Sequence, residues 1–195
     1  MNERFKFRAL LPFALAATAC SSGASEPPLA GAAIGGPFIL TDQDGRRVSE
    51  RDFAGKYRIM YFGFTHCPDV CPTDLAAIGK GLKAFEVKDK ARAEKVVPIF
   101  VSVDPERDTP AVMKDYVANF HARMIGLTGS PEEIAKVAKE YAVWSEKGEA
   151  QPGGGYNVNH SRAEILMGPD GTPIALLPDD QGVDGIERTL ERWVK

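Results

Sequence analysis

The sequence predicts an α/β domain over residues 37–195, with a central mixed sheet, helices on both faces and an N-terminal hairpin extension. Three observations support this fold class. Apolar runs alternate with segments whose apolar residues recur every three or four positions, the pattern of strands alternating with helices. Residues 96–103 are apolar almost throughout, as expected for a strand covered on both faces. Cys67 and Cys71 lie where the first such strand gives way to its helix, which is typical of a thioredoxin-like fold.

The predicted elements follow one another along the domain. Apolar residues at 38–40 and 48 flank an Asp-Gly turn and predict the hairpin. A strand at 59–64 leads into the cysteines, and the helix after them reaches about Lys88, although Gly79 and Gly81 weaken it. The other predicted elements are a strand at 96–103, a helix capped by Thr109 and Pro110 with Val112, Met113, Tyr116, Val117 and Phe120 buried, a strand at 125–128, a helix opened by the capping box Ser130–Glu133, a hairpin over 163–177 and a closing helix over 183–195.

A glycine-rich stretch at 148–155 precedes this hairpin. It is not a phosphate-binding loop, because no Lys-Ser or Lys-Thr pair follows the glycines and no predicted strand precedes them. We therefore expect a mobile connector at this point of the chain.

The first residues of the chain predict export. Residues 1–19 have a basic start, a short apolar core and small residues at 17–19, which is the pattern of a signal peptide. Cys20 follows directly and resembles the acylated cysteine of a bacterial lipobox, so we expect a lipid-modified Cys20. A cleaved soluble form and a retained anchor are the alternatives. Residues 20–36 are rich in Ser, Ala, Gly and Pro and predict a flexible tether. The domain would then lie on the periplasmic face of a bacterial cell envelope, anchored to its membrane.

The overall composition excludes some classes of protein. The 195 residues suffice for one domain with a full core, and 44% hydrophobic with 26% charged residues is ordinary for a soluble globular protein. A net charge of −3 does not suggest nucleic-acid binding. No apolar run approaches the roughly 20 residues that a membrane-spanning helix needs.

The cysteine pair is the strongest chemical signal in the chain. If Cys67 and Cys71 both lie in the first helical turn, they share one face of the helix, and two sulfurs so placed can form a disulfide or hold one soft metal ion. The free N–H groups at a helix start also favour a thiolate. A purely structural disulfide is the alternative, although a bridge over so short a loop removes little entropy from the unfolded chain.

Four segments closely resemble the signature of the Sco/SenC family of copper-handling proteins. The first runs from Phe62 to Pro72 and contains both cysteines. The others are Val101–Pro110, Gly126–Gly129 and Tyr156–Ser161, and all four occur in the family's order. The resemblance extends from about Phe38 to the C-terminus, and the run of Gly and Pro just before Tyr156 is its clearest departure.

This resemblance implies a thioredoxin-like fold anchored at a membrane, with copper as Cu(I) or Cu(II) held by two cysteines and a distant histidine. These ligands match Cys67, Cys71 and His160. It further implies a role in assembling the dinuclear copper centre of cytochrome c oxidase subunit II. That subunit or another copper acceptor is the implied partner, with other copper chaperones and thioredoxin-like reductants as further candidates. We expect a metallochaperone, not an enzyme that turns over.

Two alternative functions use the same cysteines. A membrane-anchored thiol–disulfide oxidoreductase would need only Cys67 and Cys71 as its catalytic redox pair, acting on the cysteines of a copper acceptor. A peroxidase ranks below it, because Phe64 stands where a peroxiredoxin has a threonine.

Three further polar residues lie in or near these segments. His66 is expected to point away from the cysteines, since adjacent positions do not share a helix face. His121 follows an amphipathic helix and is expected to be solvated or to cap that helix. Asp104 is expected either to tune the metal site or to cap the helix that follows it.

Overall fold

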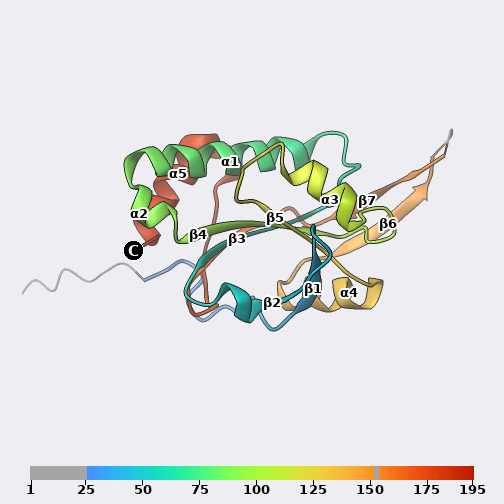
Figure 1. The fold of residues 1–195 in the computed structure, drawn as a ribbon, viewed down its shortest axis with the longest axis horizontal. Coiled ribbons are helices and arrows are strands. Elements are labelled where there is room, and N and C mark those ends of the chain that lie inside the picture. Colours follow the sequence, from blue (N-terminus) through green and yellow to red (C-terminus); the bar gives the residue numbers. More distant parts are fainter. Residues whose placement is uncertain (1–25, 152–153) are drawn as a thin grey trace, which may run out of the picture.

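The computed structural model describes residues 26–151 and 154–195 and has a seven-stranded mixed sheet at its centre (Figure 1). The strand order is β2-β1-β5-β4-β3-β8-β9, in which β3, β4 and β5 run parallel and antiparallel pairs extend the sheet on both sides. The strands are β1 (Ile39–Asp42), β2 (Arg47–Ser49), β3 (Tyr57–Gly63), β4 (Val96–Ser102), β5 (Ile125–Thr128), β8 (Glu164–Met167) and β9 (Pro173–Leu176). The predicted α/β class with a mixed sheet is confirmed.

Helices cover both faces of this sheet, as predicted. In Figure 1 the helices α1, α3 and α5 lie above the sheet and α4 lies below it. The helices are α1 (Val70–Lys88), α2 (Lys90–Ala93), α3 (Pro110–Val117), α4 (Pro131–Glu140) and α5 (Gly182–Trp193), with 3-10 turns η1 (Glu50–Phe53) and η2 (Asp179–Gln181). The short α2 was not predicted, because four residues give no periodic signal.

Strand β3 is buried along its whole length, which explains its near-continuous apolar sequence. Its successive side chains point to opposite faces of the sheet. The Tyr61 ring stacks on Phe100 on the α1 side, with ring centroids 6.2 Å apart, and Phe62 contacts Tyr141 at the end of α4. The C-terminal ends of β3 and β4 are side by side, since Gly63 pairs with Ser102. The turns that follow these two strands therefore meet at one edge of the sheet.

The predicted helix starts are confirmed. The side chain of Thr109 accepts a hydrogen bond from the N–H of Val112, and Ser130 forms a reciprocal capping box with Glu133. One assignment on α3 was wrong: Val112, predicted to be buried, is exposed, while Met113 and Val117 are buried. Consecutive side chains of an α-helix point in different directions, so Val112 faces solvent while its neighbour Met113 faces the core.

The glycines of α1 have a packing role. A Cβ atom at Gly79 would lie 2.3 Å from the carbonyl oxygen of Phe120, and one at Gly81 would lie 2.6 Å from Cγ2 of Ile186 in α5. Both distances are far inside van der Waals contact. Glycine lowers the helix propensity at these two positions, but its missing side chain lets α1 lie close to the chain after α3 and to α5.

The expected connector at 148–155 was wrong for its first three residues, 148–150. Residues Ser145–Ala150 form strand β6, which pairs antiparallel with β7 (Tyr156–His160) in a separate two-stranded sheet. This β6–β7 hairpin projects from one end of the molecule (Figure 1). Strand β6 was missed because it is largely solvent-exposed and so lacks the apolar alternation of a half-buried strand. Its register shifts between Lys147 and Ala150, and a Cβ atom at Gly148 would lie 3.0 Å from the carbonyl oxygen of Asn157.

The described chain begins at Glu26, at the end of the molecule opposite the β6–β7 hairpin (Figure 1). Residues 26–36 lie against the domain and do not form the expected free tether: the N–H of Leu29 donates to the carbonyl of Ile174, and that of Gly35 to the carbonyl of Glu140. Leu29 and Ile34 also pack on the core. The predicted signal peptide and Cys20 lie outside the described residues.

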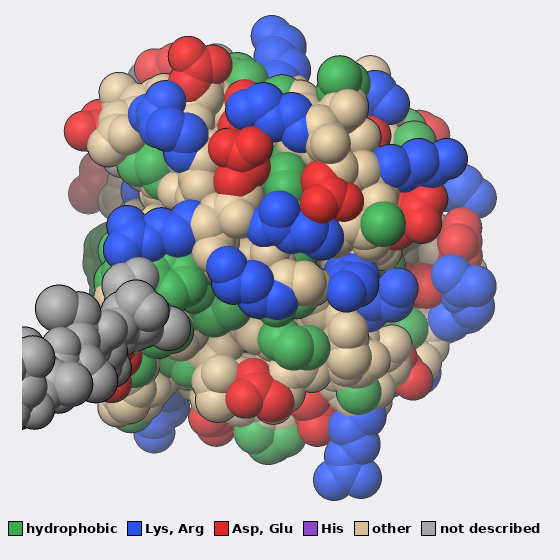
Figure 2. Space-filling view, turned by 90° about the vertical axis from the view of Figure 1, so that its left-hand side faces the viewer, with side chains coloured by type: hydrophobic (Ala, Val, Ile, Leu, Met, Phe, Trp, Pro, Cys, Tyr) green, Lys and Arg blue, Asp and Glu red, His purple; other side chains and the backbone are tan. Residues whose placement is uncertain are grey.

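Charged side chains of both signs are mixed on the face that Figure 2 shows, which is the C-terminal end of the molecule. Lys88, for example, pairs with Glu187 and Glu191 there. In the part of the chain that the structure describes, no helix has the length and apolar character needed to cross a bilayer.

Candidate metal centre

Cys67 lies in the turn before α1, and only Cys71 is helical. The condition that both cysteines lie in the first helical turn is therefore not met, since α1 begins at Val70. The reason is local: the chain turns at 65–69, where the N–H of Cys67 donates to the Phe64 carbonyl. The Cys67 sulfur then accepts the N–H of Cys71 at 3.4 Å. It thus occupies the anion-favouring position at the helix start that the sequence analysis anticipated.

Cys71 is fully buried, whereas Cys67 is half-buried. Burial raises the pKa of the Cys71 thiol to about 12, because the apolar surroundings disfavour the thiolate, and its contact with the Cys67 thiol adds to the shift. The phenol of Tyr61 contacts the same sulfur and acts in the opposite direction. Both cysteines are free thiols in this structure. Cys71 is thus the protected partner and Cys67 the accessible one.

His160, the last residue of β7, lies next to the cysteines as predicted. Its Nε2 atom is 3.5 Å from the Cys71 sulfur, 89 positions earlier in the chain. Its Nδ1 atom is 3.0 Å from the carbonyl oxygen of Ser161. A carbonyl can only accept, so Nδ1 is the donor in this contact, and Nε2 is the ring atom that faces the thiol. The ring also packs edge-on against Phe64, with centroids 6.0 Å apart.

Asp104 neither caps α3 nor approaches the sulfurs. Thr109 is the cap, and the Asp104 carboxylate instead accepts the Tyr156 hydroxyl at 2.7 Å and pairs with Arg107. The Arg107 guanidinium stacks on the Tyr156 ring at 3.7 Å, and Lys147 lies 4.1 Å from that ring's centroid. Because Tyr156 begins β7, this cluster holds the far end of the His160 strand to the turn after β4.

Asp108 fixes the other side of the cysteine turn. Its carboxylate is fully buried and accepts hydrogen bonds from the Ser102 hydroxyl at 2.6 Å and from the Thr65 hydroxyl at 2.6 Å. The Thr65 N–H also donates to it at 3.1 Å. His66 is half-exposed, and its Nδ1 atom lies 3.8 Å from the same carboxylate. Sequence reasoning did not single out Asp108, although it shares one short acidic turn with Asp104.

His121 is remote from the cysteines, and its predicted solvation was wrong. Its side chain is only 7% exposed. Its Nδ1 atom accepts the N–H of Arg123 at 3.1 Å, and Nε2 lies 3.2 Å from the Glu86 carboxylate. Burial lowers its pKa, because the charged ring would lose its hydration. This histidine is a satisfied internal residue of the α1–α3 contact.

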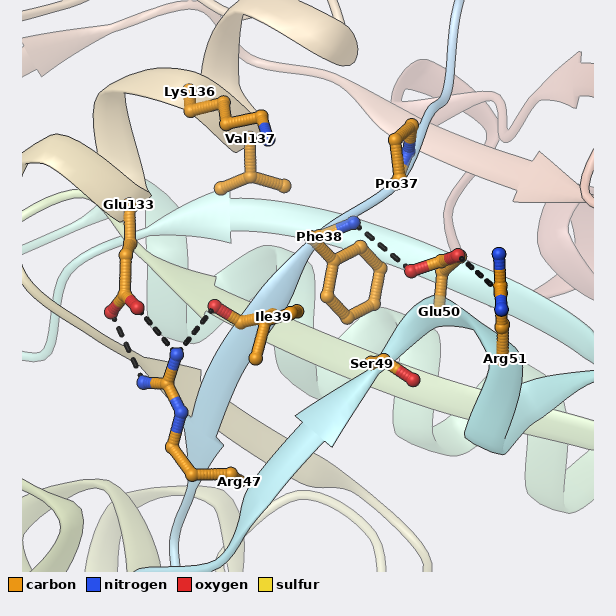
Figure 3. Close-up of a pocket in the computed structure, with 10 residues that line it drawn as sticks. All are labelled: Pro37, Phe38, Ile39, Arg47, Ser49, Glu50, Arg51, Glu133, Lys136 and Val137. Atoms are coloured by element: carbon orange, nitrogen blue, oxygen red, sulfur yellow. Dashed lines mark hydrogen bonds and ion pairs between the residues drawn. The ribbon is translucent and has the colours of Figure 1, made fainter.

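One large cavity lies away from the cysteines. It measures about 570 Å³ and lies between β1, β2 and α4 (Figure 3). Arg47 forms a two-pronged ion pair with Glu133 there, and Phe38 donates its N–H to Glu50 at 3.1 Å. None of the ten lining residues is a cysteine or histidine. The candidate site is therefore identified by its cysteine and histidine side chains and not by the volume of a cavity.

The three predicted ligands converge at one edge of the sheet without forming a closed coordination shell. Cys71 touches both Cys67 and His160. Across residues 26–151 and 154–195, no three His, Cys, Asp or Glu side chains already stand as a complete metal-binding group. Two sulfurs and one imidazole nitrogen are a soft and incomplete donor set, which suits copper better than a four-ligand structural zinc site.

Known proteins resemble this chain in sequence and in structure. The profile of the family described as SCO1/SenC matches residues 26–195. The chain belongs to the SCO1/SenC family. The mitochondrial Protein SCO1 homolog 1 of Arabidopsis thaliana is 45% identical over 167 residues, which are 85% of this chain and 49% of that protein. The chain thus spans about half the length of the curated relatives it matches.

Two similar SCO1/SenC structures were solved with copper bound. Arabidopsis thaliana ScoI is 42% identical, with a TM-score of 0.77 over 82% of this chain and 98% of that one. Bradyrhizobium japonicum ScoI is 43% identical, with a TM-score of 0.74 over 83% and 99%. A more distant relative, from Bacillus anthracis, is described as a SCO1/SenC family lipoprotein, at 26% identity and a TM-score of 0.67 over 83% and 95%.

The thioredoxin-like fold is also confirmed by comparison. The thioredoxin domain of a Bacteroides vulgatus thiol-disulfide oxidoreductase superposes with a TM-score of 0.56 over 83% of this chain and 96% of that domain. At 18% identity this likeness concerns the fold alone.

The unequal burial of the two thiols predicts unequal alkylation. Iodoacetamide reacts with thiolates, so Cys67 should be modified first at pH 7–8, and Cys71 should react faster as the pH rises toward 12. Peptide mass mapping over time measures each thiol. The Cys67→Ser and Cys71→Ser variants isolate the two rates, and equal rates at pH 7 would contradict the buried position of Cys71.

Proposed function

We propose that this chain is a copper carrier that assists assembly of the dinuclear copper centre in subunit II of cytochrome c oxidase. Cys67, Cys71 and His160 are the proposed ligands. The observation that carries the proposal is the 3.5 Å approach of His160 Nε2 to the Cys71 sulfur, because dithiol chemistry alone does not require that histidine. The copper-bound structures of similar SCO1/SenC proteins support the choice of metal.

The ligand chemistry suits copper held as cargo. Thiolate and neutral imidazole are soft donors that favour Cu(I), and an added ligand would accommodate Cu(II). Each thiol that binds copper gives up one proton, and the Cys71 proton is strongly held because its pKa is raised to about 12. Copper uptake should therefore strengthen as pH rises. The half-buried Cys67 gives a partner's ligands access to the metal, which fits transfer better than permanent storage.

A second function uses the same pair of thiols. Cys67 and Cys71 are free and in contact, so they could reduce a disulfide in the copper acceptor. In that exchange the dithiol would lose two electrons and two protons and become a disulfide, while the acceptor disulfide would gain both and become a dithiol. A disulfide cannot serve as two thiolate ligands, so this reaction would also release copper.

We further propose a location on the outer side of a bacterial membrane, with Cys20 lipidated. The signal-like residues 1–19, the cysteine at 20 and the description of a Bacillus anthracis relative as a lipoprotein support this location. Since the described chain begins at the end opposite the β6–β7 hairpin, an anchor on that side would leave the cysteines pointing away from the membrane.

Replacing His160 should separate the two functions. His160→Ala should lower Cu(I) affinity, measured by competition with a chromophoric chelator, while leaving the dithiol able to oxidise and reduce. His66→Ala is the matched control, because His66 adjoins Cys67 but turns toward Asp108. Unchanged affinity in His160→Ala would remove His160 from the ligand set and favour the oxidoreductase.

Oxidation should close the copper site. After a Cys67–Cys71 disulfide has formed, the protein should bind less than one tenth of the copper that the reduced protein binds, and a thiol reductant should restore binding. Copper counted by atomic absorption on desalted protein measures this. Full loading of the oxidised protein would exclude the two sulfurs as ligands.

Lipid attachment predicts a specific mass. Mature protein extracted from membranes should begin at Cys20 and carry acyl chains on it, and intact-mass spectrometry should detect both. Cys20→Ser should release the protein from the membrane fraction. A mature N-terminus at any other residue, without lipid, would refute the anchor.

A further inference from the structure

A buried ion pair joins the two segments that carry the proposed ligands. Asp74 lies three residues after Cys71 in α1, and Arg162 lies two residues after His160. The Arg162 Nε atom donates to one carboxylate oxygen of Asp74 at 2.8 Å, and its Nη2 atom donates to the other at 2.5 Å. This two-pronged geometry fixes the orientation of both groups, unlike a single ion contact.

The carboxylate of the pair is out of solvent, whereas the guanidinium is partly exposed. The Asp74 side chain is 2% exposed and that of Arg162 is 42% exposed. A buried carboxylate is costly without partners, and Asp74 has a second one in the Tyr61 hydroxyl at 3.0 Å. Asp74 is therefore held in place within α1 by Tyr61 and joined to the histidine segment through Arg162.

The spacing of these residues makes two parallel contacts between helix and strand. Cys71 and Asp74 are three apart and share one face of α1. His160 is the last residue of β7, and Arg162 lies two residues beyond it, in the segment that leads to β8. Cys71 meets His160 and Asp74 meets Arg162, so the second contact lies one helical turn behind the first.

We propose that the Asp74–Arg162 pair is a positioning pair that sets the approach of His160 to the cysteine sulfurs. The inference rests on the proposed copper function and adds to it two residues outside the proposed ligand set. The cluster of Asp104, Arg107 and Tyr156 holds the start of β7 to the turn after β4. The Asp74–Arg162 pair instead holds the end of β7 to the helix that begins at the cysteines.

The test is a double-mutant cycle on copper affinity. Arg162→Gln should weaken Cu(I) binding about tenfold, as loss of a group that orients a metal ligand commonly does. In a His160→Ala background the same substitution should have no further effect on copper affinity, because the pair acts through the histidine. Arg162→Lys keeps the positive charge but cannot form the two-pronged hydrogen bond, so its copper affinity should lie between those of Arg162→Gln and the parent.

A matched control addresses loss of stability. Arg123 forms a similar part-buried ion pair with Glu86, at 2.6 Å, on the side of α1 away from the cysteines. Arg123→Gln should lower the free energy of unfolding without changing copper affinity. If Arg162→Gln fails to fold, Asp74→Asn combined with Arg162→Gln leaves no unpaired charge and takes its place in the cycle.

The outcomes separate this inference from the proposed function. Equal affinity losses from Arg162→Gln with and without His160 would refute the positioning role, as would a parental affinity in Arg162→Gln. The Cu(II) absorption spectrum is a second readout: it should shift in Arg162→Gln and stay parental in Arg123→Gln. If the His160→Ala single variant binds copper like the parent, His160 is not a ligand. That result refutes the proposed ligand set whatever the effect of Arg162→Gln.

Discussion

The approach of strand β7 to the first turn of α1 is the contact on which the site depends. Cys67 and Cys71 come from the junction after β3, whereas His160 arrives from a hairpin that is not part of the main sheet. The 3.5 Å contact between His160 and Cys71 lies between two polar contacts made by this part of the chain. Tyr156 fastens one end to Asp104, and Arg162 fastens the other to Asp74.

Burial and reactivity oppose each other at this contact. The apolar surroundings that order Cys71 also raise the pKa of its thiol, so the resting site favours the protonated form. A metal ion that replaces the proton compensates for the buried negative charge, which an empty thiolate site could not do. Cys67 lies at the solvent edge and accepts an N–H from the start of α1. The two cysteines thus have different environments, one suited to retention and one to exchange.

Much of the fold could be predicted from the sequence, because strands, helices and caps leave signals within short stretches of the chain. The strands of the main sheet, four of the five helices and the caps at Thr109 and Ser130 follow from periodicity and capping chemistry. The β6 strand was missed because both of its faces meet solvent and its residues carry no apolar alternation. The sequence left open whether Cys67 belongs to the helix, because spacing alone does not reveal where a helix begins. The Asp74–Arg162 pair left one readable signal, a carboxylate on the buried face of an amphipathic helix, but its partner 88 positions away could not be read from the chain.

The ligand set is the central claim, and X-ray absorption at the copper edge tests it most directly. Reduced protein loaded with one equivalent of Cu(I) should give a first shell of two sulfurs and one nitrogen, and His160→Ala should lose the nitrogen contribution. A shell of sulfur alone in the parent, or copper–copper scattering from metal shared between molecules, would contradict the account.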